Sequence, residues 1–233
     1  MNTHTDTIVP RHLGFIVDGN RRWAKQHGIP VYEGHLAGYN ALKDVIIATV
    51  DAGVEYVSLY TFSTENWQRA KEEVNNLMGL MMRLFKTDLK LLLENDLRLV
   101  VAGSRERLPK KMNDAIDSVQ ERTAHCTRGT VVICFNYGGQ QEIIHAVKQL
   151  IDEGTASEDV TVELLSEKMY QPEVPAVDMI VRTSGEKRLS NFMLWRSPYS
   201  ELLFIDTLFP DMTKADVTAI IEEYSKRHRR FGG

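Results

Sequence analysis

An acid and two arginines directly follow the first predicted strand of the chain, Leu13–Val17. The segment reads Asp18, Gly19, Asn20, Arg21, Arg22 and Trp23, and a helical pattern continues after it. A glycine lets the backbone approach a bound group, and N–H groups at a helix start combine with guanidinium groups to suit an anion. The alternative is a helix cap at Asp18 with solvated arginines, and this segment alone leaves both interpretations open. It matches neither glycine-rich nucleotide-binding motif.

Two further predicted strands end in segments of the same kind. The strand Val54–Phe62 is followed by Ser63, Thr64, Glu65, Asn66, Trp67, Gln68 and Arg69. The strand Met179–Arg182 leads into Thr183, Ser184, Gly185, Glu186, Lys187, Arg188, Leu189 and Ser190. Arginines beside small hydroxyl and amide groups are suited to phosphate. A hydroxyl at the first position of such a segment can also simply start a helix.

The arginines of these segments contrast with the composition of the chain. The sequence has 28 Lys and Arg against 32 Asp and Glu, a formal net charge of −4. Four arginines nevertheless fall in the segments that follow strands: Arg22, Arg69, Arg182 and Arg188. Each charge-assisted hydrogen bond to phosphate contributes roughly 1.5–3 kcal/mol, and four arginines exceed what one monophosphate needs. The pattern favours a diphosphate or two separate anions.

Two acids next to these arginines predict a metal ion. Asp18, and Glu201 beside the last predicted strand, Leu202–Asp206, would repel bound anions unless a cation lay between them. Mg²⁺ takes this place with one or two carboxylates and the oxygens of a substrate. The simpler interpretation of Glu201 is a surface carboxylate. We expect Mg²⁺, held by Asp18 and Glu201.

One predicted helix, Asn75–Glu94, is unusually apolar. It contains the run Leu77–Phe85, with three methionines, and a second cluster of leucines at Leu89–Leu93. By default such a helix belongs to the core. Its methionines would also suit the deformable wall of a tunnel for an aliphatic chain. An anion site beside such a wall indicates an amphiphile with a phosphate head and a hydrocarbon tail.

The elements that must position these residues alternate along the chain. Short apolar runs predict strands at Leu13–Val17, Val54–Phe62, Leu97–Ala102, Thr130–Asn136, Met179–Arg182 and Leu202–Asp206. Helical periodicity lies between them, at Ala37–Asp51, Asn75–Glu94, Pro109–Ala124, Gln141–Ile151 and, capped by Thr213, Lys214–His228. The alternation predicts a single α/β domain over residues 13–233, with a mostly parallel six-stranded sheet flanked by helices. Ligands are expected beyond the carboxyl ends of the strands.

Composition sets further limits. A hydrophobic fraction of 43% over 233 residues is enough for a sizeable core, and the mild acidity argues against a nucleic-acid partner. Cys126 and Cys134 cannot make a Cys/His zinc site and are expected to stay reduced. Residues 1–12 are expected to form a flexible N-terminal segment. Because that segment has no signal-peptide pattern and no apolar stretch reaches about 18 residues, we expect a cytoplasmic protein.

Together these motifs resemble those of the cis-prenyltransferase family. The resemblance lies in Asp18–Ala24, Gly34-His35, Phe62–Trp67 with Arg69, Asn136–Gly139, Arg182–Glu186, Arg188–Phe192, Glu201-Leu202 and the terminal Arg230-Phe231-Gly232. It covers residues 13–233 in the order and spacing of the family. The aspartate-rich metal motif of the trans-type prenyl synthases is absent from the sequence.

The resemblance implies a fold, an activity and partners. It implies a homodimeric α/β enzyme with a hydrophobic tunnel, which adds isopentenyl diphosphate units to an allylic diphosphate such as farnesyl diphosphate with cis stereochemistry. The expected product is a long-chain polyprenyl diphosphate, above all undecaprenyl diphosphate, the precursor of a lipid carrier in cell-wall synthesis. Contact with a membrane would be peripheral, through the lipid product.

The resemblance also implies roles for individual residues. Asp18 would coordinate Mg²⁺ and assist departure of the allylic diphosphate, with Glu201 as a second metal contact. Asn66 would help remove the proton from isopentenyl diphosphate, although a neutral amide is a poor base and suits positioning better. The allylic diphosphate would be held by Gly19, Asn20, Arg21, Arg22 and His35, with Arg69 nearby. Isopentenyl diphosphate would be held by Arg182, Arg188 and Ser190. Further substrate contacts would come from Trp23, Ser63, Thr64, Glu65, Trp67, Leu189, Arg230 and Gly232.

Two positions depart from the family pattern. Members commonly have an arginine three residues before the Gly-His pair, where this chain has Val31, so Lys25 or Arg21 would have to supply that contact. Thr61 stands where long-chain enzymes place a small residue facing the tunnel, so a medium- or short-chain cis-prenyl diphosphate synthase is the alternative. A non-catalytic prenyl-binding subunit is a further alternative. It predicts loss of the metal-binding acid, and Asp18 is present.

Overall fold

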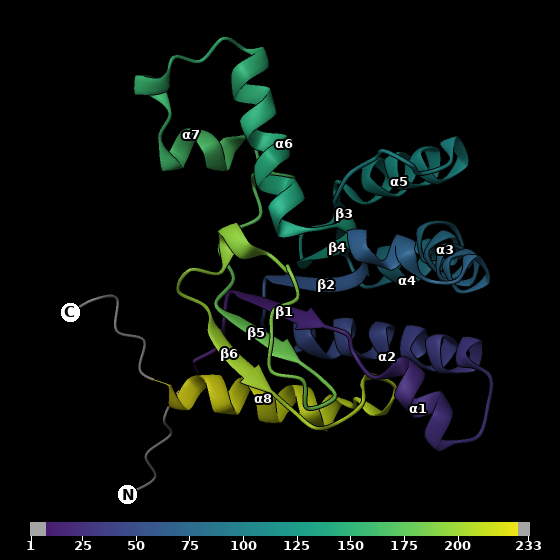
Figure 1. The fold of residues 1–233 in the computed structure, drawn as a ribbon. Coiled ribbons are helices and arrows are strands. Elements are labelled where there is room, and N and C mark those ends of the chain that lie inside the picture. The colour runs from purple at the N-terminus through teal and green to yellow at the C-terminus, as the bar shows by residue number, and fades with distance from the viewer. Residues whose placement is uncertain (1–7, 228–233) are drawn as a thin grey trace, which may run out of the picture.

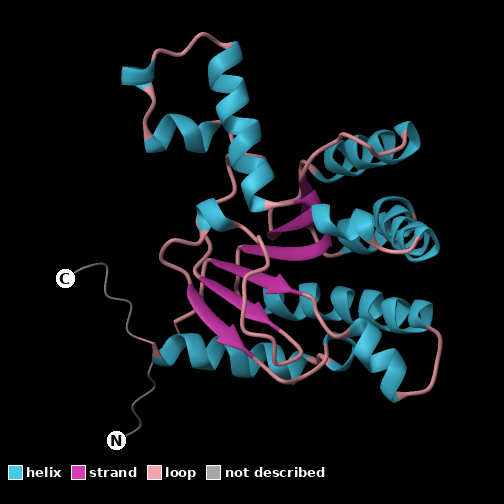
Figure 2. Cartoon of the chain, in the orientation of Figure 1, coloured by secondary structure: helices cyan, strands magenta, loops and turns pink. Residues whose placement is uncertain are grey.

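A six-stranded parallel sheet forms the centre of the structure (Figures 1 and 2). The computed structural model describes residues 8–227. The strands are β1 (His12–Ile16), β2 (Tyr56–Ser63), β3 (Leu97–Ala102), β4 (Gly129–Tyr137), β5 (Met179–Arg182) and β6 (Glu201–Phe204), in the order β3-β4-β2-β1-β5-β6. The chain leaves β1 toward β2 and returns on the other side of β1 with β5. Such a reversal opens a crevice beyond the carboxyl ends of these three strands.

Helices cover one face of the sheet more completely than the other. They are α1 (Asn20–Gln26), α2 (Val31–Asp51), α3 (Lys71–Lys86), α4 (Leu89–Glu94), α5 (Lys110–Thr123), α6 (Gly139–Asp152), α7 (Val162–Glu167) and α8 (Lys214–Lys226). Apolar residues of α2, α3, α5 and α8 join the larger core cluster on one face. The other face packs mainly against the segment between α7 and β6, while α6 and α7 project away from the sheet (Figure 1).

The strands and helices lie close to the predicted positions, with one clear difference. The predicted helix Asn75–Glu94 begins at Lys71 and is divided into α3 and α4. At the break, the carboxylate of Asp88 accepts a hydrogen bond from the hydroxyl of Tyr39 and lies 3.6 Å from Nζ of Lys43. Both partners belong to α2. The predicted helix is therefore interrupted at the residue that contacts α2.

The described part of the expected flexible segment, residues 8–12, is attached to the domain. The backbone N–H of Ile8 donates to Oγ of Ser225 at 3.0 Å, and the carbonyl of Arg11 accepts from Glu55 and Tyr56. His12 is the first residue of β1 and is completely buried. Strand β1 therefore begins one residue before the predicted strand Leu13–Val17. Residues 1–7 lie outside the described residues.

His12 is held neutral inside the protein. Its Nδ1 lies 2.9 Å from the carbonyl oxygen of Pro175, which can only accept, so Nδ1 carries the proton. Its Nε2 is 2.7 Å from Oγ of Ser58. Burial lowers the pKa of His12 to about 4. In the unfolded chain the same imidazole takes up a proton near pH 6.5.

Acidification is therefore expected to destabilise the fold through His12. Between pH 6.5 and 4 the unfolded state binds a proton that the folded state refuses, so stability falls as the pH falls. From pH 7 to pH 5 the loss from this group is about 2 kcal/mol. Urea denaturation at the two pH values measures it, and His12→Asn should lose that part of the pH dependence. An equal pH dependence in wild type and variant would remove His12 as the cause.

Among residues 8–227, no helix has the length and apolar character needed to cross a membrane.

Candidate active site

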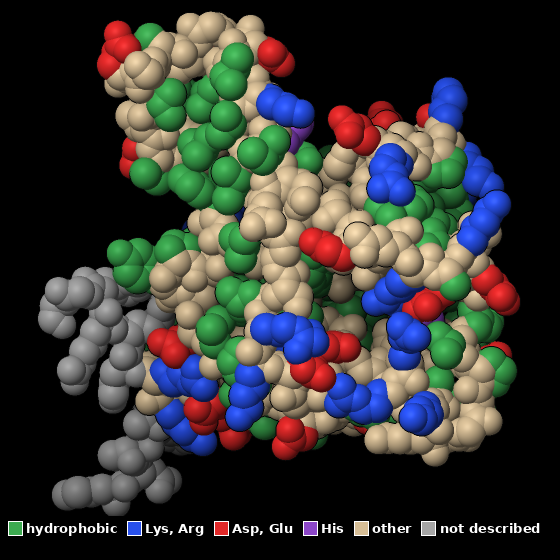
Figure 3. Space-filling model, viewed as in Figure 1, with side chains coloured by type: hydrophobic (Ala, Val, Ile, Leu, Met, Phe, Trp, Pro, Cys, Tyr) green, Lys and Arg blue, Asp and Glu red, His purple; other side chains and the backbone are tan. Residues whose placement is uncertain are grey.

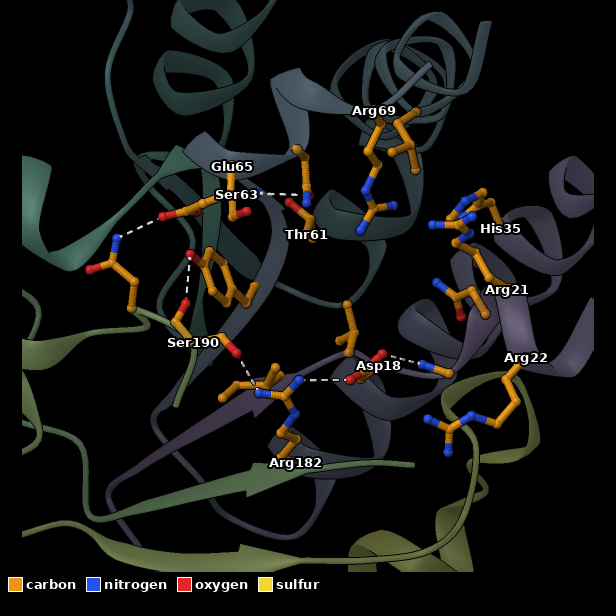
Figure 4. A pocket seen from close by; sticks show the side chains of 18 of the residues that line it. Asp18, Arg21, Arg22, His35, Thr61, Ser63, Glu65, Arg69, Arg182 and Ser190 are labelled. Atoms are coloured by element: carbon orange, nitrogen blue, oxygen red, sulfur yellow. Dashed lines mark hydrogen bonds and ion pairs between the residues drawn. The ribbon is translucent and has the colours of Figure 1, made fainter. Parts of the chain in front are cut away.

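A pocket of about 780 Å³ opens at the carboxyl edge of β1, β2 and β5 (Figure 4). The turn after β1, helix α2, the short 3₁₀ segment Thr64–Gln68 (η1) after β2, and the loop after β5 all contribute to its wall. The structure brings these predicted site residues together there: Asp18, Gly19, Asn20, Arg21, Arg22, His35, Ser63, Glu65, Asn66, Arg69, Arg182, Arg188 and Ser190. The crevice expected from a parallel sheet is thus where these residues converge.

The ion pair between Asp18 and Arg182 lies at the centre of the pocket. Arg182 donates to Oδ2 of Asp18 at 2.8 Å, to Oγ of Ser190 at 2.7 Å and to the carbonyl of Arg188 at 2.6 Å. Its side chain is only 5% exposed, while that of Asp18 is 35% exposed. Nε of Arg182 is buried without a partner. The guanidinium is therefore fixed in position, and the carboxylate is the more exposed member of the pair.

The turn that presents Asp18 depends on Gly19. Gly19 has a φ of +113°, and a Cβ at this position would come within 3.1 Å of Leu208. The backbone N–H of Gly19 donates to Oδ1 of Asp18 at 2.8 Å, which orients the carboxylate. Thr183, after β5, donates its hydroxyl to the carbonyl of Asp18 at 2.6 Å and accepts from the N–H of Asp18 at 2.9 Å. The loops after β1 and β5 are therefore joined at Asp18.

Glu73 of α3 gathers three basic side chains on one wall of the pocket. Its Oε1 lies 2.8 Å from Arg69, 3.2 Å from Nε2 of His35 and 4.0 Å from Arg21. Partial burial pushes the pKa of Glu73 up, but the nearby Arg69, His35 and Arg21 outweigh burial, so the pKa lies below its ordinary value. Burial lowers the pKa of His35, whose imidazole is therefore neutral at pH 7. Sequence reasoning missed Glu73, which lies in the first turn of α3, four residues after Arg69.

Glu186 pairs with two further arginines of the pocket. Its carboxylate pairs with Arg188 at 2.5 Å and with Arg22 at 3.0 Å. The hydrogen bond from Arg188 is the main cause that lowers the pKa of Glu186. Arg22 also donates to the carbonyl of Ser184 at 2.7 Å. Because Arg22 and Arg188 are about half exposed, these ion pairs are weak, and an anionic ligand can replace the carboxylate.

Asn66 is oriented by a capping box at the start of η1. Its Oδ1 accepts from the backbone N–H of Ser63 at 3.0 Å, while the Ser63 side chain accepts from the backbone of Asn66. Glu65, next to it, accepts hydrogen bonds from Asn191 at 3.1 Å and from Thr64 at 3.2 Å. The reciprocal bonds fix the direction of the Asn66 amide. They also commit its oxygen, so its NH₂ group is the end that is available to a ligand.

Several predicted substrate contacts lie outside this pocket. The indole N–H of Trp23 donates to Asp211 at 2.7 Å, and its ring lies 4.0 Å from that of His27. The indole N–H of Trp67 donates to Asn136 at 2.7 Å, and Trp67 and Thr64 line a separate hollow of about 560 Å³. Leu189 packs against the second core cluster. Neighbouring residues of a helical turn point in different directions. Residues that are close in sequence to pocket residues therefore need not line the pocket themselves.

Two predicted contacts cannot be placed. Arg230 and Gly232 belong to the C-terminal motif, and residues 228–233 lie outside the described residues.

Glu201 lies at the amino ends of the strands, whereas Asp18 lies at their carboxyl ends. It is the first residue of β6, and its register partner is Met179, the first residue of β5. Asp18, in contrast, follows the carboxyl end of β1. The carboxylate of Glu201 pairs with Arg227 at 2.9 Å. Within one chain Asp18 and Glu201 therefore do not share a site, because Asp18 follows β1 whereas Glu201 begins β6, and these positions lie at opposite ends of parallel strands.

The pocket is also lined by four apolar or aromatic side chains, of which the sequence had singled out only Leu77. They are Ile16, Val17, Tyr60 and Leu77, and they lie beside Thr61. Tyr60 is nearly buried, and its hydroxyl donates to the carbonyls of Tyr137 and Ser190 at 3.3 Å each. An apolar floor below charged walls fits a ligand with a charged head and a hydrocarbon tail.

The two departures from the family pattern occupy different places. Val31 is the first residue of α2, is 38% exposed and does not line the pocket. Arg21 lines the pocket, whereas Lys25 does not. Of the two residues considered as replacements for the missing arginine, only Arg21 is therefore in position. Thr61 lines the pocket, and its hydroxyl donates to the carbonyl of Cys134 at 3.2 Å.

The residues present fit a magnesium ion only together with a ligand. Within residues 8–227, no group of three or more His, Cys, Asp or Glu side chains could hold a metal ion. Asp18 offers one partly exposed carboxylate in a pocket that is also lined by arginines. Mg²⁺ is commonly bound through one or two carboxylates plus the phosphates of a substrate. A single acid at Asp18 suits that mode.

The chain is similar to known proteins over nearly its whole length. The chain matches the family described as "Putative undecaprenyl diphosphate synthase" over residues 16–232. It is 43% identical over 227 residues to the isoprenyl transferase of Thermotoga maritima, with 97% of each chain covered. It is 44% identical over 232 residues to the isoprenyl transferase of Listeria innocua, with 98% of this chain and 92% of the relative covered.

Two solved structures resemble the fold over almost its whole length. A "probable undecaprenyl diphosphate synthase" from Campylobacter jejuni superposes with a TM-score of 0.81 at 32% identity, with both chains covered completely. Lavandulyl diphosphate synthase from Lavandula x intermedia, in complex with dimethylallyl diphosphate, superposes with a TM-score of 0.93 at 30% identity, covering 98% of this chain and 100% of the other. With the family match and the near-complete coverage of its relatives, the chain belongs to the undecaprenyl diphosphate synthase family and is a cis-prenyltransferase.

Proposed function

We propose that the chain joins isopentenyl diphosphate to an allylic diphosphate in the pocket around Asp18, with Mg²⁺ as cofactor. One observation carries the proposal: two groups of phosphate-binding side chains lie on different sides of Asp18 in one pocket (Figure 4). The first group is Arg21, Arg22, His35 and Arg69, and the second group is Arg182, Arg188 and Ser190. Two diphosphates held face to face would bring their hydrocarbon parts together, as a condensation requires.

The first group suits the allylic diphosphate. In the reaction the bond between the allylic carbon and the diphosphate oxygen breaks, and the electron pair leaves with the diphosphate. Arginines that already face this group stabilise its growing negative charge without reorganisation. Glu73 and Glu186 hold Arg69 and Arg22 in place before the ligand arrives. When bound at Asp18, Mg²⁺ would supply further electrostatic stabilisation of the same leaving group.

The second group suits isopentenyl diphosphate. The double bond of this substrate attacks the allylic carbon, so a new carbon–carbon bond forms and one proton is then lost. Arg182 is fixed by its hydrogen bonds to Asp18 and Ser190 and to the carbonyl of Arg188. A rigid donor of this kind fixes the orientation of the diphosphate and hence the direction of attack.

Asn66 acts as a positioning group in this scheme. Its amide oxygen is committed to the N–H of Ser63, so it could accept a proton only by giving up the capping box. The NH₂ group can donate to a phosphate oxygen of isopentenyl diphosphate. That phosphate is the proposed proton acceptor, because a neutral amide is a poor base.

The experiment supplies dimethylallyl, geranyl or farnesyl diphosphate with Mg²⁺ and radiolabelled isopentenyl diphosphate. Incorporation of label into an extended chain, with cis geometry at each new double bond by NMR, is the expected result. Absence of label from every chain, with a protein that is folded by circular dichroism, would contradict the proposal.

Ser190→Ala should weaken the binding of isopentenyl diphosphate but not that of the allylic diphosphate. The hydroxyl accepts from Arg182 at 2.7 Å, so its loss removes one partner that fixes the guanidinium, at a cost of about 1 kcal/mol. We expect KM for isopentenyl diphosphate to rise about fivefold, with kcat nearly unchanged. Ser184→Ala is the matched control, because the Ser184 hydroxyl is buried without a partner in the same loop and does not line the pocket. Equal KM values in both variants would contradict the assignment.

A homodimer, a cytoplasmic location and peripheral membrane contact complete the proposal. The lobe of α6 and α7 carries exposed apolar side chains, among them Ile144, Ile151 and Val162 (Figure 3). Tyr199 and Leu202, near the edge strand β6, are also exposed. A second copy that covers such residues would remove apolar surface from water. Light scattering coupled to size exclusion measures the oligomeric state, and a monomer at micromolar concentration would contradict the homodimer.

A further inference from the structure

We propose that Asn191 is a positioning residue of the isopentenyl diphosphate site, because its side chain holds the loop that carries Ser190 against the segment that carries Asn66. The proposal rests on the proposed function and deepens it, because it names the residue that aligns two parts of that site. Asn191 lies in the loop after β5 and lines the pocket. Its neighbours Arg188, Leu189 and Ser190 were assigned to a substrate from the sequence, whereas Asn191 was noted only as part of the motif.

The amide of Asn191 contacts two other elements through its two ends. Its Oδ1 accepts from the backbone N–H of Gln140, in the first turn of α6, at 2.8 Å. Its Nδ2 donates to Oε1 of Glu65, in η1, and to Oε1 of Gln141, at 3.1 Å each. A backbone N–H can only donate and an ionised carboxylate can only accept, so these partners determine the orientation of the amide. One side chain therefore joins the loop after β5, η1 and α6.

The backbone of Asn191 supports the same junction. Its carbonyl accepts from the N–H of Gly139, the first residue of α6, at 2.7 Å. Gly138, the N-cap of α6, has no side chain that could accept a hydrogen bond, so Asn191 supplies both capping oxygens from another part of the chain. Asn191 has a φ of +66°, and asparagine adopts this left-handed conformation more readily than most residues. The position therefore suits asparagine in both its backbone and its side chain.

The junction is packed so closely that neither glycine leaves room for a side chain. A Cβ at Gly138 would lie 2.7 Å from Oγ1 of Thr64 and 2.8 Å from Nδ2 of Asn191. A Cβ at Gly139 would lie 2.8 Å from Cγ of Leu194 and 3.1 Å from the carbonyl oxygen of Asn191. The loop after β5 thus lies directly against η1 and the start of α6. In such close packing, a displacement of one segment moves the others.

Two groups proposed to bind isopentenyl diphosphate lie next to the hydrogen bond between Asn191 and Glu65. Ser190 precedes Asn191, and its hydroxyl accepts from Arg182 at 2.7 Å. Asn66 follows Glu65 in η1. In the proposed function both groups act on the same diphosphate, although they belong to different elements. Because a substrate is oriented only by groups that are held in a fixed arrangement, the hydrogen bond between Asn191 and Glu65 aligns Ser190 with Asn66.

An aspartate at position 191 would separate this alignment from the capping of α6. Partial burial raises the pKa of Glu65, but hydrogen bonds from its own backbone N–H and from Asn191, Ser63 and Thr64 outweigh burial, so the pKa lies below its ordinary value. Glu65 is therefore ionised at pH 7, and a second carboxylate in place of the Asn191 amide would repel it. The aspartate would keep an oxygen for the N–H of Gln140, and aspartate also suits a helix start and a positive φ.

Steady-state kinetics of Asn191→Asp and Asn191→Gly test the proposal. We expect Asn191→Asp to raise KM for isopentenyl diphosphate about five- to tenfold, with KM for the allylic diphosphate nearly unchanged. Asn191→Gly tolerates the positive φ and adds no charge. A rise in the same KM in the glycine variant would exclude repulsion of the substrate by the new carboxylate as the cause. The glycine variant also serves if the aspartate variant does not fold.

Glu65→Gln combined with Asn191→Asp should restore the junction. The amide of the glutamine can donate to the carboxylate of the aspartate, so the hydrogen bond is formed again with donor and acceptor exchanged. We expect KM for isopentenyl diphosphate in the double variant to lie within about threefold of that in Glu65→Gln alone, because comparison with the single variants isolates the contribution of the pair. A double variant with no such recovery would show that Asn191 does not act through Glu65, and would overturn the proposal.

Asn95→Asp is the matched control for a loss of stability. Nδ2 of Asn95 donates to the carbonyl of Leu91 at 2.8 Å, and Asn95 does not line the pocket. We expect this variant to unfold at a lower temperature than wild type, with both KM values unchanged. An active wild type together with folded Asn191→Asp and Asn191→Gly variants of unchanged KM for isopentenyl diphosphate would overturn this inference alone. A wild-type protein that forms no product would overturn the proposed function, and this inference with it.

Discussion

Replacing Asp18 with asparagine should lower kcat/KM for the condensation by about 10³-fold and leave the fold intact. The asparagine would keep the shape of the side chain and one oxygen for the N–H of Gly19, so the turn after β1 should survive. It would lose the negative charge that faces Arg182 at 2.8 Å and that would hold Mg²⁺. Steady-state kinetics at saturating Mg²⁺, together with a thermal unfolding curve, measures both parts of the prediction.

Asp211→Asn is a matched control for this change. Asp211 accepts a hydrogen bond from Trp23 at 2.7 Å but does not line the pocket. The same chemical substitution at Asp211 should change kcat/KM less than about threefold. Turnover close to wild type in Asp18→Asn would exclude the Asp18 carboxylate from the mechanism.

The second large effect is expected for Arg182→Lys. Lysine keeps the positive charge, but its single ammonium group cannot reproduce the planar set of donors that contacts Asp18, Ser190 and the carbonyl of Arg188. Loss of two charge-assisted hydrogen bonds, at roughly 1.5–3 kcal/mol each, corresponds to a fall in kcat/KM of about 10²- to 10⁴-fold. Both KM for isopentenyl diphosphate and kcat should change, because Arg182 is proposed to bind that substrate and donates a hydrogen bond to Asp18.

Arg98→Lys provides the comparison for the lysine substitution. Arg98 forms an exposed ion pair with Glu173 at 3.1 Å and does not line the pocket. Exposed pairs contribute little to stability, so the kinetics of this variant should match those of wild type. If the kinetics of Arg182→Lys also matched those of wild type, the planar set of donors of Arg182 would have no role beyond its positive charge.

The position of the pocket was predictable because it follows from topology. Apolar runs that alternate with helical periodicity predicted a parallel sheet, and the carboxyl ends of its strands then defined the crevice. Asp18 and Arg182, which are far apart in sequence, were assigned to that crevice and form an ion pair there. Their convergence needed no information beyond the order of strands and the residues that follow them.

The directions of individual side chains were not predictable in this way. Trp23 and Trp67 lie within the right motifs but point toward Asp211 and Asn136. Glu201 was expected beside Asp18 although Glu201 precedes its predicted strand and Asp18 follows β1, and in a parallel sheet these positions lie at opposite ends of the strands. Glu73 was missed because its role appears only when α3 packs beside His35 and Arg21.

Whether α3 packs in the core or lines the pocket could also be decided only from the three-dimensional structure. The apolar sequence of α3 is equally compatible with a tunnel wall and with a filled core. Leu77 of α3 lines the pocket, whereas Leu84 and Phe85 of the same helix are buried in the core, so α3 contributes to both. Sequence periodicity indicates that a side chain is buried, but it does not indicate whether a cavity remains beside that side chain.

A crystal structure with isopentenyl diphosphate, a non-reactive thiolo analogue of an allylic diphosphate and Mg²⁺ tests the central claim most directly. The account predicts one diphosphate against Arg21, Arg22 and His35, and the other against Arg182, Arg188 and Ser190, with the two hydrocarbon parts meeting above Thr61. Diphosphates bound away from these residues, for example in the separate hollow beside Trp67 and Lys148, would contradict it.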